Sequence, residues 1–271
     1  MAFQPAFRPA FQPAFRPPFG ASGAAVITQA EALAMLYPGA EIGAYYEVHP
    51  DHLSQDSAGT TPVTADSQPV GRMLDLSGNG NHITQADAAR RPLYRTDGTF
   101  YWLQFDGIDD RLGTTFSPRN DGTIGLSVDY DAPLGSGMYG LGARYITSGD
   151  PGIGMGYSSV TDSPFLQVRT NTGAYALRKT EGSNTISRLV GTLQSGGQRL
   201  TDGEEVDNST FAYTPGLVDG HTLSIGDTGA DALSGATLRF KGKFRGGFYS
   251  SGVVSAADAD ALAMRFKSLA P

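Results

Sequence analysis

The sequence predicts an all-β antiparallel sandwich preceded by an extended N-terminal arm. Its 271 residues include 36 Gly and 16 Pro, and only 17% of them are charged. This composition is typical of many short strands joined by turns and not of helical bundles. Asp-Gly pairs recur between apolar stretches, for example at Gly98, Gly107 and Gly122, and they favour the tight turns of antiparallel hairpins. One arm and one body of roughly 230 to 250 residues account for the length.

The arm begins with a four-residue repeat, Ala-Phe-Gln-Pro alternating with Ala-Phe-Arg-Pro. Its regular prolines remove backbone donors and keep the preceding residues extended, so no helix or central strand can form there. Its phenylalanines are unfavourable to leave in water. We therefore predict that residues 1–24 dock on a partner through Phe3, Phe7, Phe11, Phe15 and Phe19. The arm can span on the order of 55 to 60 Å, enough to reach across a neighbouring copy in a homo-oligomer. The alternative is a plain low-complexity linker.

Two short helices are expected, one at each end of the body. Thr28 and Glu31 have the spacing of a capping box, which opens a helix within a connecting segment, residues 25–43. Near the C-terminus, Ser255 and Asp258 resemble a second capping box and precede an apolar stripe. That stripe would lie against the strands of the body.

The body, residues 44–271, is expected to consist mainly of strands. The segment before Gly246 alternates basic residues with apolar residues or glycine, as a strand with one buried face does. The exposed face of this strand would carry Arg239, Lys241, Lys243 and Arg245. Like charges at this spacing repel one another unless water or an anionic partner screens them. We predict a contact face for an acidic protein neighbour or an anionic glycan, and a solvated strand face is the alternative.

Five fragments follow one another between residues 44 and 111. They are Gln55-Asp56-Ser57-Ala58-Gly59-Thr60-Thr61-Pro62-Val63, Pro69-Val70-Gly71-Arg72, Asp75-Leu76-Ser77-Gly78-Asn79-Gly80-Asn81-His82, Ala89-Arg90-Arg91-Pro92-Leu93-Tyr94 and Leu103-Gln104-Phe105-Asp106-Gly107-Ile108-Asp109-Asp110. In this order they resemble the LamG-like, concanavalin A-like jelly-roll domains of tailed-phage and prophage virion proteins. The rest of the chain follows that pattern more loosely, through residues 200–206, which are similar to a hairpin of the same fold.

The resemblance implies a jelly-roll sandwich in a virion that is assembled in the cytoplasm of a bacterial host. Together with the arm, it predicts a non-enzymatic structural protein, either a capsid decoration protein or a tail-associated protein. Its partners would be other virion proteins of the capsid or tail lattice and, through weak carbohydrate binding, cell-surface glycans. A carbohydrate-binding lectin or a tail-fibre receptor-binding protein is the alternative.

Three carboxylates, those of Asp106, Asp109 and Asp110, lie within five residues of one another beside a turn. Ca²⁺ takes hard oxygen ligands of this kind. LamG-like domains often bind Ca²⁺ at the rim of the sandwich, so the resemblance implies that these residues are the metal ligands. The alternative is turn chemistry, in which Asp106 opens an Asx-type turn at Gly107. No other cofactor is expected.

A glycoside hydrolase is the less favoured function, and no catalytic residues are predicted. Related sandwiches include glucanases that place Glu-x-Asp-x-Glu along one strand. Glu205 and Asp207 begin such a pattern, but Ser209 stands where the second Glu is needed. Hydrolysis of a glycosidic bond requires two carboxylates. His49 and His52 are interpreted as turn residues and not as metal ligands.

Composition excludes several other classes of protein. The net charge of −7 argues against a nucleic-acid partner, since such proteins ordinarily carry a basic surface. The chain has no cysteine, so it forms no disulfide and uses no thiolate chemistry. No run approaches the roughly 18 apolar residues of a membrane span, so no membrane partner is predicted.

Overall fold

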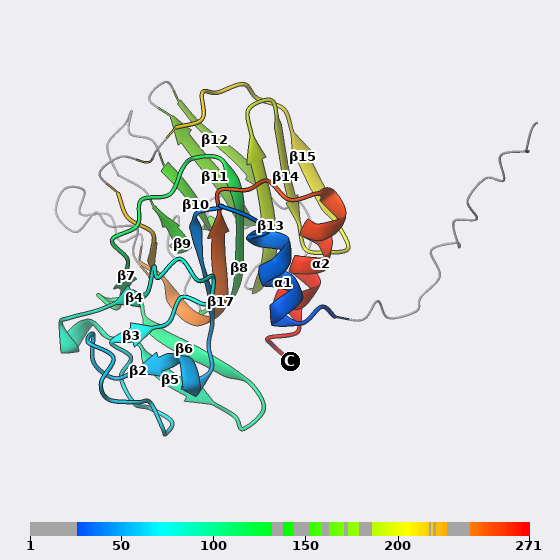
Figure 1. Cartoon of the computed structure of the whole chain (residues 1–271). Helices are drawn as coiled ribbons and strands as arrows, with labels where there is room; N and C mark the ends of the chain where they lie inside the picture. Colours follow the sequence, from blue (N-terminus) through cyan, green and yellow to red (C-terminus); the bar gives the residue numbers. More distant parts are fainter. Residues whose placement is uncertain are drawn as a thin grey trace, which may run out of the picture.

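The computed structural model describes residues 26–131, 138–143, 152–158, 163–170, 173–178, 186–216, 218, 221–226 and 239–271. Within these ranges the protein consists of two antiparallel sheets packed face to face, with two α-helices against the outer face of one sheet (Figure 1). The predicted all-β sandwich is therefore confirmed. The arm, with Phe3, Phe7, Phe11, Phe15 and Phe19, lies outside the described residues. Among the described helices, none is long and apolar enough to cross a membrane.

The first sheet has the strand order β15-β14-β13-β8-β17-β6-β5, and β1 also pairs with β17. Its strands are β1 (Gly43–Glu47), β5 (Leu93–Thr96), β6 (Tyr101–Asp106), β8 (Gly122–Tyr130), β13 (Ile186–Gln194), β14 (Gly197–Thr201), β15 (Val206–Ser209) and β17 (Lys241–Ser250). The hairpin expected around residues 200–206 is formed by β14 and β15, which pair antiparallel.

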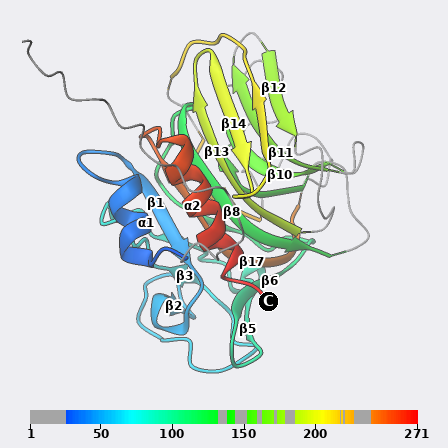
Figure 2. The ribbon, with the colours of Figure 1, turned by 90° about the vertical axis from the view of Figure 1, so that its right-hand side faces the viewer.

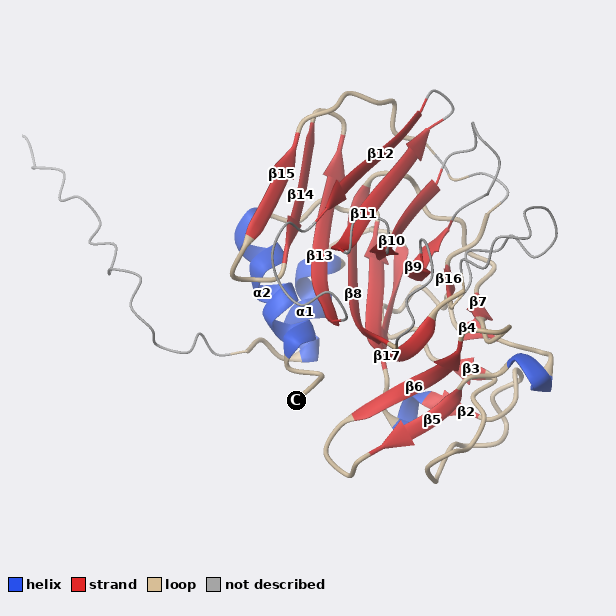
Figure 3. Cartoon of the chain, turned by 180° about the vertical axis from the view of Figure 1, so that it is seen from behind, coloured by secondary structure: helices blue, strands red, loops and turns tan. Residues whose placement is uncertain are grey.

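The second sheet has the order β12-β11-β10-β9-β16-β7-β4-β3-β2. Its strands are β2 (Leu53–Ser54), β3 (Arg72–Met73), β4 (Ile83–Thr84), β7 (Leu112–Gly113), β9 (Met138–Ala143), β10 (Gly152–Ser158), β11 (Ser163–Thr170), β12 (Gly173–Arg178) and β16 (Ser224–Ile225). Figure 3 shows this arrangement from behind.

β17 changes its neighbour on one side halfway along its length. Residues 241–244 pair with β6, whereas residues 246–250 pair with β1. Arg245 stands between these two pairings, and the register of β17 against β8 shifts at the same place, which is a β-bulge. The extra residue reverses the direction of the side chains that follow it. Phe244 therefore lies in the core between the sheets, while Phe248 lies under the helices.

The two faces of the first sheet bury separate apolar clusters. The inner cluster lies between the sheets, and there the ring of Phe240 packs 5.3 Å from Phe105 and 5.4 Å from Tyr130. The outer cluster joins the two helices to the sheet (Figure 2), with the ring of Phe266 lying 5.4 Å from Phe248 and 6.0 Å from Tyr45. Both helices are thus held by apolar burial on one sheet face.

Helix α1 (Gln29–Leu36) begins at the predicted capping box. The backbone N–H of Thr28 donates to the Glu31 carboxylate at 2.7 Å, and that of Glu31 donates to the Thr28 hydroxyl at 3.2 Å. The helix is also fixed at its end, because the Ser250 hydroxyl donates to the carbonyl of Leu36 at 2.7 Å. The expected connecting helix therefore packs on the sandwich.

Helix α2 (Ala256–Lys267) is capped by Ser255 as expected, and its polar side reaches the β14 strand. The Asp260 carboxylate accepts hydrogen bonds from Arg199 at 2.7 and 2.8 Å and from the Thr201 hydroxyl at 2.6 Å. Two short 3-10 helices complete the described elements: η1 (Pro50–His52) and η2 (Ala88–Arg90).

Candidate functional site

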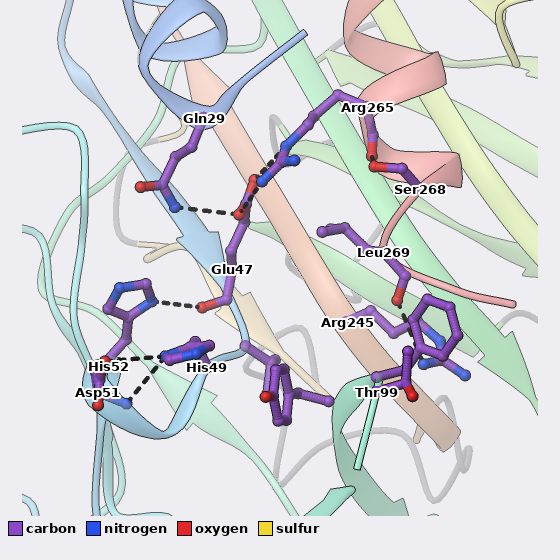
Figure 4. A pocket seen from close by; sticks show the side chains of 13 residues that line it. Gln29, Glu47, His49, Asp51, His52, Thr99, Arg245, Arg265, Ser268 and Leu269 are labelled. Carbon is purple, nitrogen blue, oxygen red and sulfur yellow. Dashed lines mark hydrogen bonds and ion pairs between the residues drawn. The ribbon is translucent and has the colours of Figure 1, made fainter. Parts of the chain in front are cut away.

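A pocket of about 480 Å³ opens beside the point where β17 exchanges β6 for β1. We name it the rim pocket. Its walls come from the start of α1, the end of β1 with η1, the turn before β6, the bulge of β17 and the end of α2 (Figure 4). The lining residues are Gln29, Glu47, Val48, His49, Asp51, His52, Thr99, Phe100, Tyr101, Arg245, Arg265, Ser268 and Leu269. This volume lies within the range of small-molecule sites.

Glu47 forms one polar wall of the rim pocket and is only 6% exposed. Its carboxylate accepts two hydrogen bonds from Arg265, at 3.1 and 2.7 Å, one from Gln29 at 3.1 Å and one from the Tyr45 hydroxyl. Burial disfavours the charged form of Arg265, but the Glu47 carboxylate outweighs it and raises the pKa of that guanidinium. The network joins α1, β1 and α2.

Aromatic rings form the facing wall. His49 and His52 have their ring centroids 5.5 Å apart, and Tyr101 meets His49 edge to face at 5.0 Å. The Nδ1 of His52 lies 3.1 Å from the carbonyl oxygen of Glu47, and because a carbonyl only accepts, this bond requires the proton on Nδ1. His49 caps the 3-10 turn η1 and His52 is its last residue, so both are turn residues as expected, and both also line the pocket.

Arg245 corrects the predicted contact face, because its side chain is only 3% exposed. It donates to Asp129 at 3.0 Å, and Arg188 pairs with the same carboxylate. Burial opposes ionisation of Asp129, but the two guanidiniums outweigh it and lower the pKa of this carboxyl. Alternation places Arg245 on the correct, outer face of the strand, but there it lies against Asp129 and the end of α2, where it also donates to the carbonyl of Leu269 at 3.5 Å. The Nε of Arg245 is buried and has no hydrogen-bond partner among the described residues.

The other three basic residues, Arg239, Lys241 and Lys243, are partly exposed, as expected of a strand face. Lys243 and Arg245 both lie over the ring of Trp102, with Lys243 Nζ 5.1 Å and Arg245 Cζ 5.3 Å from its centroid. These distances fall within cation–π range. The basic face is therefore smaller than predicted and includes an aromatic ring that alternation did not indicate.

The three aspartates predicted as metal ligands lie together. Asp106, Asp109 and Asp110 each offer a carboxylate oxygen within 4.8 Å of the others. Asp106 Oδ1 accepts the N–H of Ile108 at 2.7 Å and lies within 3.4 Å of the backbone nitrogens of the other two, which is the expected Asx-type turn. Asp109 also lies 3.8 Å from Arg90 Nε. The donor set fits Ca²⁺, but the same oxygens also serve the turn, so turn chemistry accounts for the cluster without a metal.

Asp110 is the buried member of this cluster and is 8% exposed. Burial raises its pKa to about 6, and the charges of Asp106 and Asp109 act in the same direction, against a hydrogen bond from the Asp106 backbone. A bound cation would relieve this repulsion.

The hairpin with the incomplete glucanase pattern lies elsewhere. Its β15 strand is the last strand of the first sheet, and Ser209 pairs with Gln198 of β14. The backbone N–H of Glu205 donates to the Asp202 carboxylate at 2.8 Å, so this end of the hairpin is a turn. Neither Glu205 nor Asp207 lines the rim pocket.

No family model matches the sequence, and no curated protein matches it. Solved structures match at the level of the fold. Domain 4 of an extracellular GH43 arabinanase from Geobacillus stearothermophilus, solved with arabinotriose, gives a TM-score of 0.53 at 14% identity, covering 81% of this chain and 97% of that domain. A GH54 α-L-arabinofuranosidase gives a TM-score of 0.51 at 14% identity, and the match covers 82% of this chain and 62% of that enzyme. The sialidase of Trypanosoma rangeli gives 0.51 at 14% identity, covering 91% of this chain and 35% of that one.

This comparison overturns the prediction that the chain is not an enzyme. The arabinofuranosidase and the sialidase are glycoside hydrolases, and the arabinanase domain is part of one. The prediction depended on the absence of Glu-x-Asp-x-Glu from one strand. A pair of catalytic carboxylates can also come from segments that are far apart in the sequence. The chain thus shares its fold with carbohydrate-active proteins, although it spans less than two thirds of the arabinofuranosidase and about a third of the sialidase. Its location in a virion stays a prediction.

The rim pocket itself was not predicted from the sequence. Glu47, Tyr101, Arg245 and Arg265 stand in four separate segments, and only the pairing around β17 brings them together. One signal was present, because Glu47 is an acidic residue directly after an apolar stretch, where a buried carboxylate needs partners.

Proposed function

We propose that the chain is a glycan-binding protein of a tailed-phage particle. In this proposal the arm attaches it to the capsid or tail, and the rim pocket receives a sugar unit of a cell-surface glycan. The observation that carries the proposal is the composition of the pocket, where ring faces stand opposite polar groups with fixed orientations. Ligand sites in proteins typically combine apolar or aromatic walls with a few placed polar groups.

The polar groups of the pocket are already held in place. Glu47 and Gln29 are hydrogen-bonded to each other at 3.1 Å, and Arg265 holds the carboxylate from another side. Binding to such groups loses little side-chain entropy. The Tyr101 and His49 rings provide surface for the apolar faces of a sugar ring, and the hydroxyl groups would meet the polar wall.

The comparisons support the carbohydrate part of the proposal. The matched arabinanase domain was solved with arabinotriose, and this chain covers 97% of that domain. The virion part is supported by the five fragments between residues 44 and 111 and by the chemistry of the arm. A capsid site and a tail site both satisfy these observations.

A glycan array tests the proposal. We would probe the full chain on bacterial surface polysaccharides and arabino-oligosaccharides, and then repeat the measurement with Tyr101→Ala. The matched control is Phe211→Ala, which also truncates a partly buried aromatic residue but does not line the pocket. We expect binding that Tyr101→Ala reduces at least tenfold and the control retains. An array with no binder, or equal effects of the two variants, would refute the proposal.

Glycoside hydrolysis is a second candidate activity, favoured by two carboxylates at the same pocket. Glu47 and Asp51 both line it, and a pair of carboxylates is the minimum requirement for this reaction. The Asp51 side chain is 83% exposed, so Asp51→Asn should preserve the fold. We would incubate the glycans bound on the array with the wild-type chain and with this variant, and measure released reducing ends. Release that Asp51→Asn abolishes supports hydrolysis, and no release rules it out for those glycans.

A further inference from the structure

The arm creates a physical problem in a chain that has not yet been incorporated into a particle. Its five phenylalanines are unfavourable to leave in water, so they favour the nearest suitable apolar surface. Residues 1–24 also carry Arg8 and Arg16 and no acidic residue, whereas the whole chain has a net charge of −7. The arm is therefore complementary in charge to the body of its own molecule.

The rim pocket is close to the point where the arm joins the body. Gln29, the first residue of α1, lies only five residues after the end of the arm at position 24, and it lines the pocket and donates to Glu47 at 3.1 Å. Residues 20–25 are small and include two glycines, and they can span at most about 20 Å. A segment tethered this closely has an effective concentration in the millimolar range, far above that of a second copy in dilute solution.

The lining of the pocket matches the chemistry of the arm. Proline-rich segments bind in grooves lined by aromatic rings, and the His49, His52 and Tyr101 rings lie within 5.0 to 5.5 Å of their neighbours here. Leu269 adds an apolar wall. The carboxylate of Asp51, 83% exposed, offers a partner for an arginine of the arm.

We propose that, before assembly, the end of the arm, residues 15–19, occupies the rim pocket of the same molecule. Phe15 or Phe19 fills the aromatic side, and Arg16 pairs with Asp51. The particle then removes the arm from the pocket when it binds the phenylalanines, which opens the pocket to a glycan. The consequence for glycan binding rests on the proposed function, whereas the occupancy by the arm is independent of it.

Photo-crosslinking of the full chain tests the occupancy. Tyr101 is replaced by p-benzoylphenylalanine, the purified chain is irradiated over a range of concentrations, and the cross-linked peptides are mapped by mass spectrometry. We expect cross-links to residues 15–19 within one chain, at a yield independent of concentration. The combined change Phe15→Ser and Phe19→Ser should remove them, and the matched change Phe3→Ser and Phe7→Ser should retain them. Cross-links only between chains, or none to the arm, overturn the proposal.

A second measurement separates this inference from the proposed function. If the arm fills nine pockets in ten, the apparent glycan affinity of the free chain is reduced tenfold, so the Phe15→Ser, Phe19→Ser chain should bind the array glycans about tenfold more tightly. Intramolecular cross-links without glycan binding by either chain would refute the proposed function and leave the occupancy intact. Equal glycan affinities without cross-links would refute the occupancy and leave the proposed function intact.

Discussion

Replacing Arg265 by alanine is expected to destabilise the fold strongly. The change leaves the buried Glu47 carboxylate with only the bonds from Gln29 and the Tyr45 hydroxyl. Removing one partner of a buried ion pair typically costs about 3 to 5 kcal/mol, because the remaining charge is left without compensation. For a domain of this size each kcal/mol corresponds to about 2 to 4 °C, so the melting temperature should fall by about 6 to 20 °C.

The assay is thermal unfolding of the full chain, followed by circular dichroism at pH 7. Lys267→Ala is the matched control, since it removes a cation from the same helix. Lys267 lies 3.1 Å from Glu204, but the two side chains are 30% and 69% exposed. Exposed pairs contribute about 0 to 1 kcal/mol, so this control should lower the melting temperature by at most about 4 °C.

A double variant isolates the reason for the loss. Glu47→Leu combined with Arg265→Met removes both charges, and replacing a buried pair by apolar residues of similar volume is often neutral or stabilising. The double variant should therefore melt above Arg265→Ala. If Arg265→Ala and Lys267→Ala cost the same, the buried pair does not hold α2 on the sheet and the reasoning is wrong.

Three further predictions concern the arm and the aspartate cluster. Changing Phe7, Phe11 and Phe15 to Ser should abolish incorporation into phage particles, as scored by immunoblot of purified particles. The circular dichroism spectrum of the variant should remain that of the folded sandwich. Normal incorporation of the variant would mean that the arm is only a linker. Because the pKa of Asp110 is raised to about 6, the folded state binds its proton more tightly than the unfolded state, and stability should fall as pH rises from about 4 to 6. Asp110→Asn should remove this fall and be more stable than wild type at pH 7 by up to about 3 kcal/mol. Urea unfolding at pH 4 and pH 7 measures both effects. A pH profile that Asp110→Asn leaves unchanged contradicts the cause assigned to the pKa shift. The melting temperature should not change with EDTA or with added Ca²⁺. A cation that binds the three aspartates, at a hundredfold excess over its dissociation constant, would raise the free energy of unfolding by about 2.7 kcal/mol, and such a rise would contradict this prediction.

Local chemistry was the part of the fold that the sequence allowed us to predict. The capping box of Thr28 and Glu31 and the turn at Gly98 involve residues within a few positions of one another, and the structure has both. Gly98 has a φ of 92°, as the turn between β5 and β6 requires. Such features depend on short-range hydrogen bonds and backbone conformation, which neighbouring residues determine.

The candidate site depends on contacts that local patterns do not contain. Alternation placed Arg245 on the outer face of its strand, but the end of α2 and the Asp129 carboxylate lie against it there and bury it. Glu47 and Arg265 are 218 positions apart in the sequence, and only the docking of α2 on β1 makes them partners. A bulge and a helix docking angle follow from the packing of the whole body, so no single segment predicts them.

The way α1 is fastened to the sandwich determines where a mechanical load would enter the molecule. A pull on the arm reaches α1 first, and the far end of this helix is tied by the Ser250 hydroxyl to Leu36 at 2.7 Å and by the Tyr37 hydroxyl to the carbonyls of Ala44 and Tyr249 at 2.9 and 2.8 Å. Two of these three ties end on β17, which lies between β8 on one side and β6 and β1 on the other. A force applied through the arm would therefore reach an interior strand that its neighbours hold on both sides, and not an edge strand that could separate from the sheet.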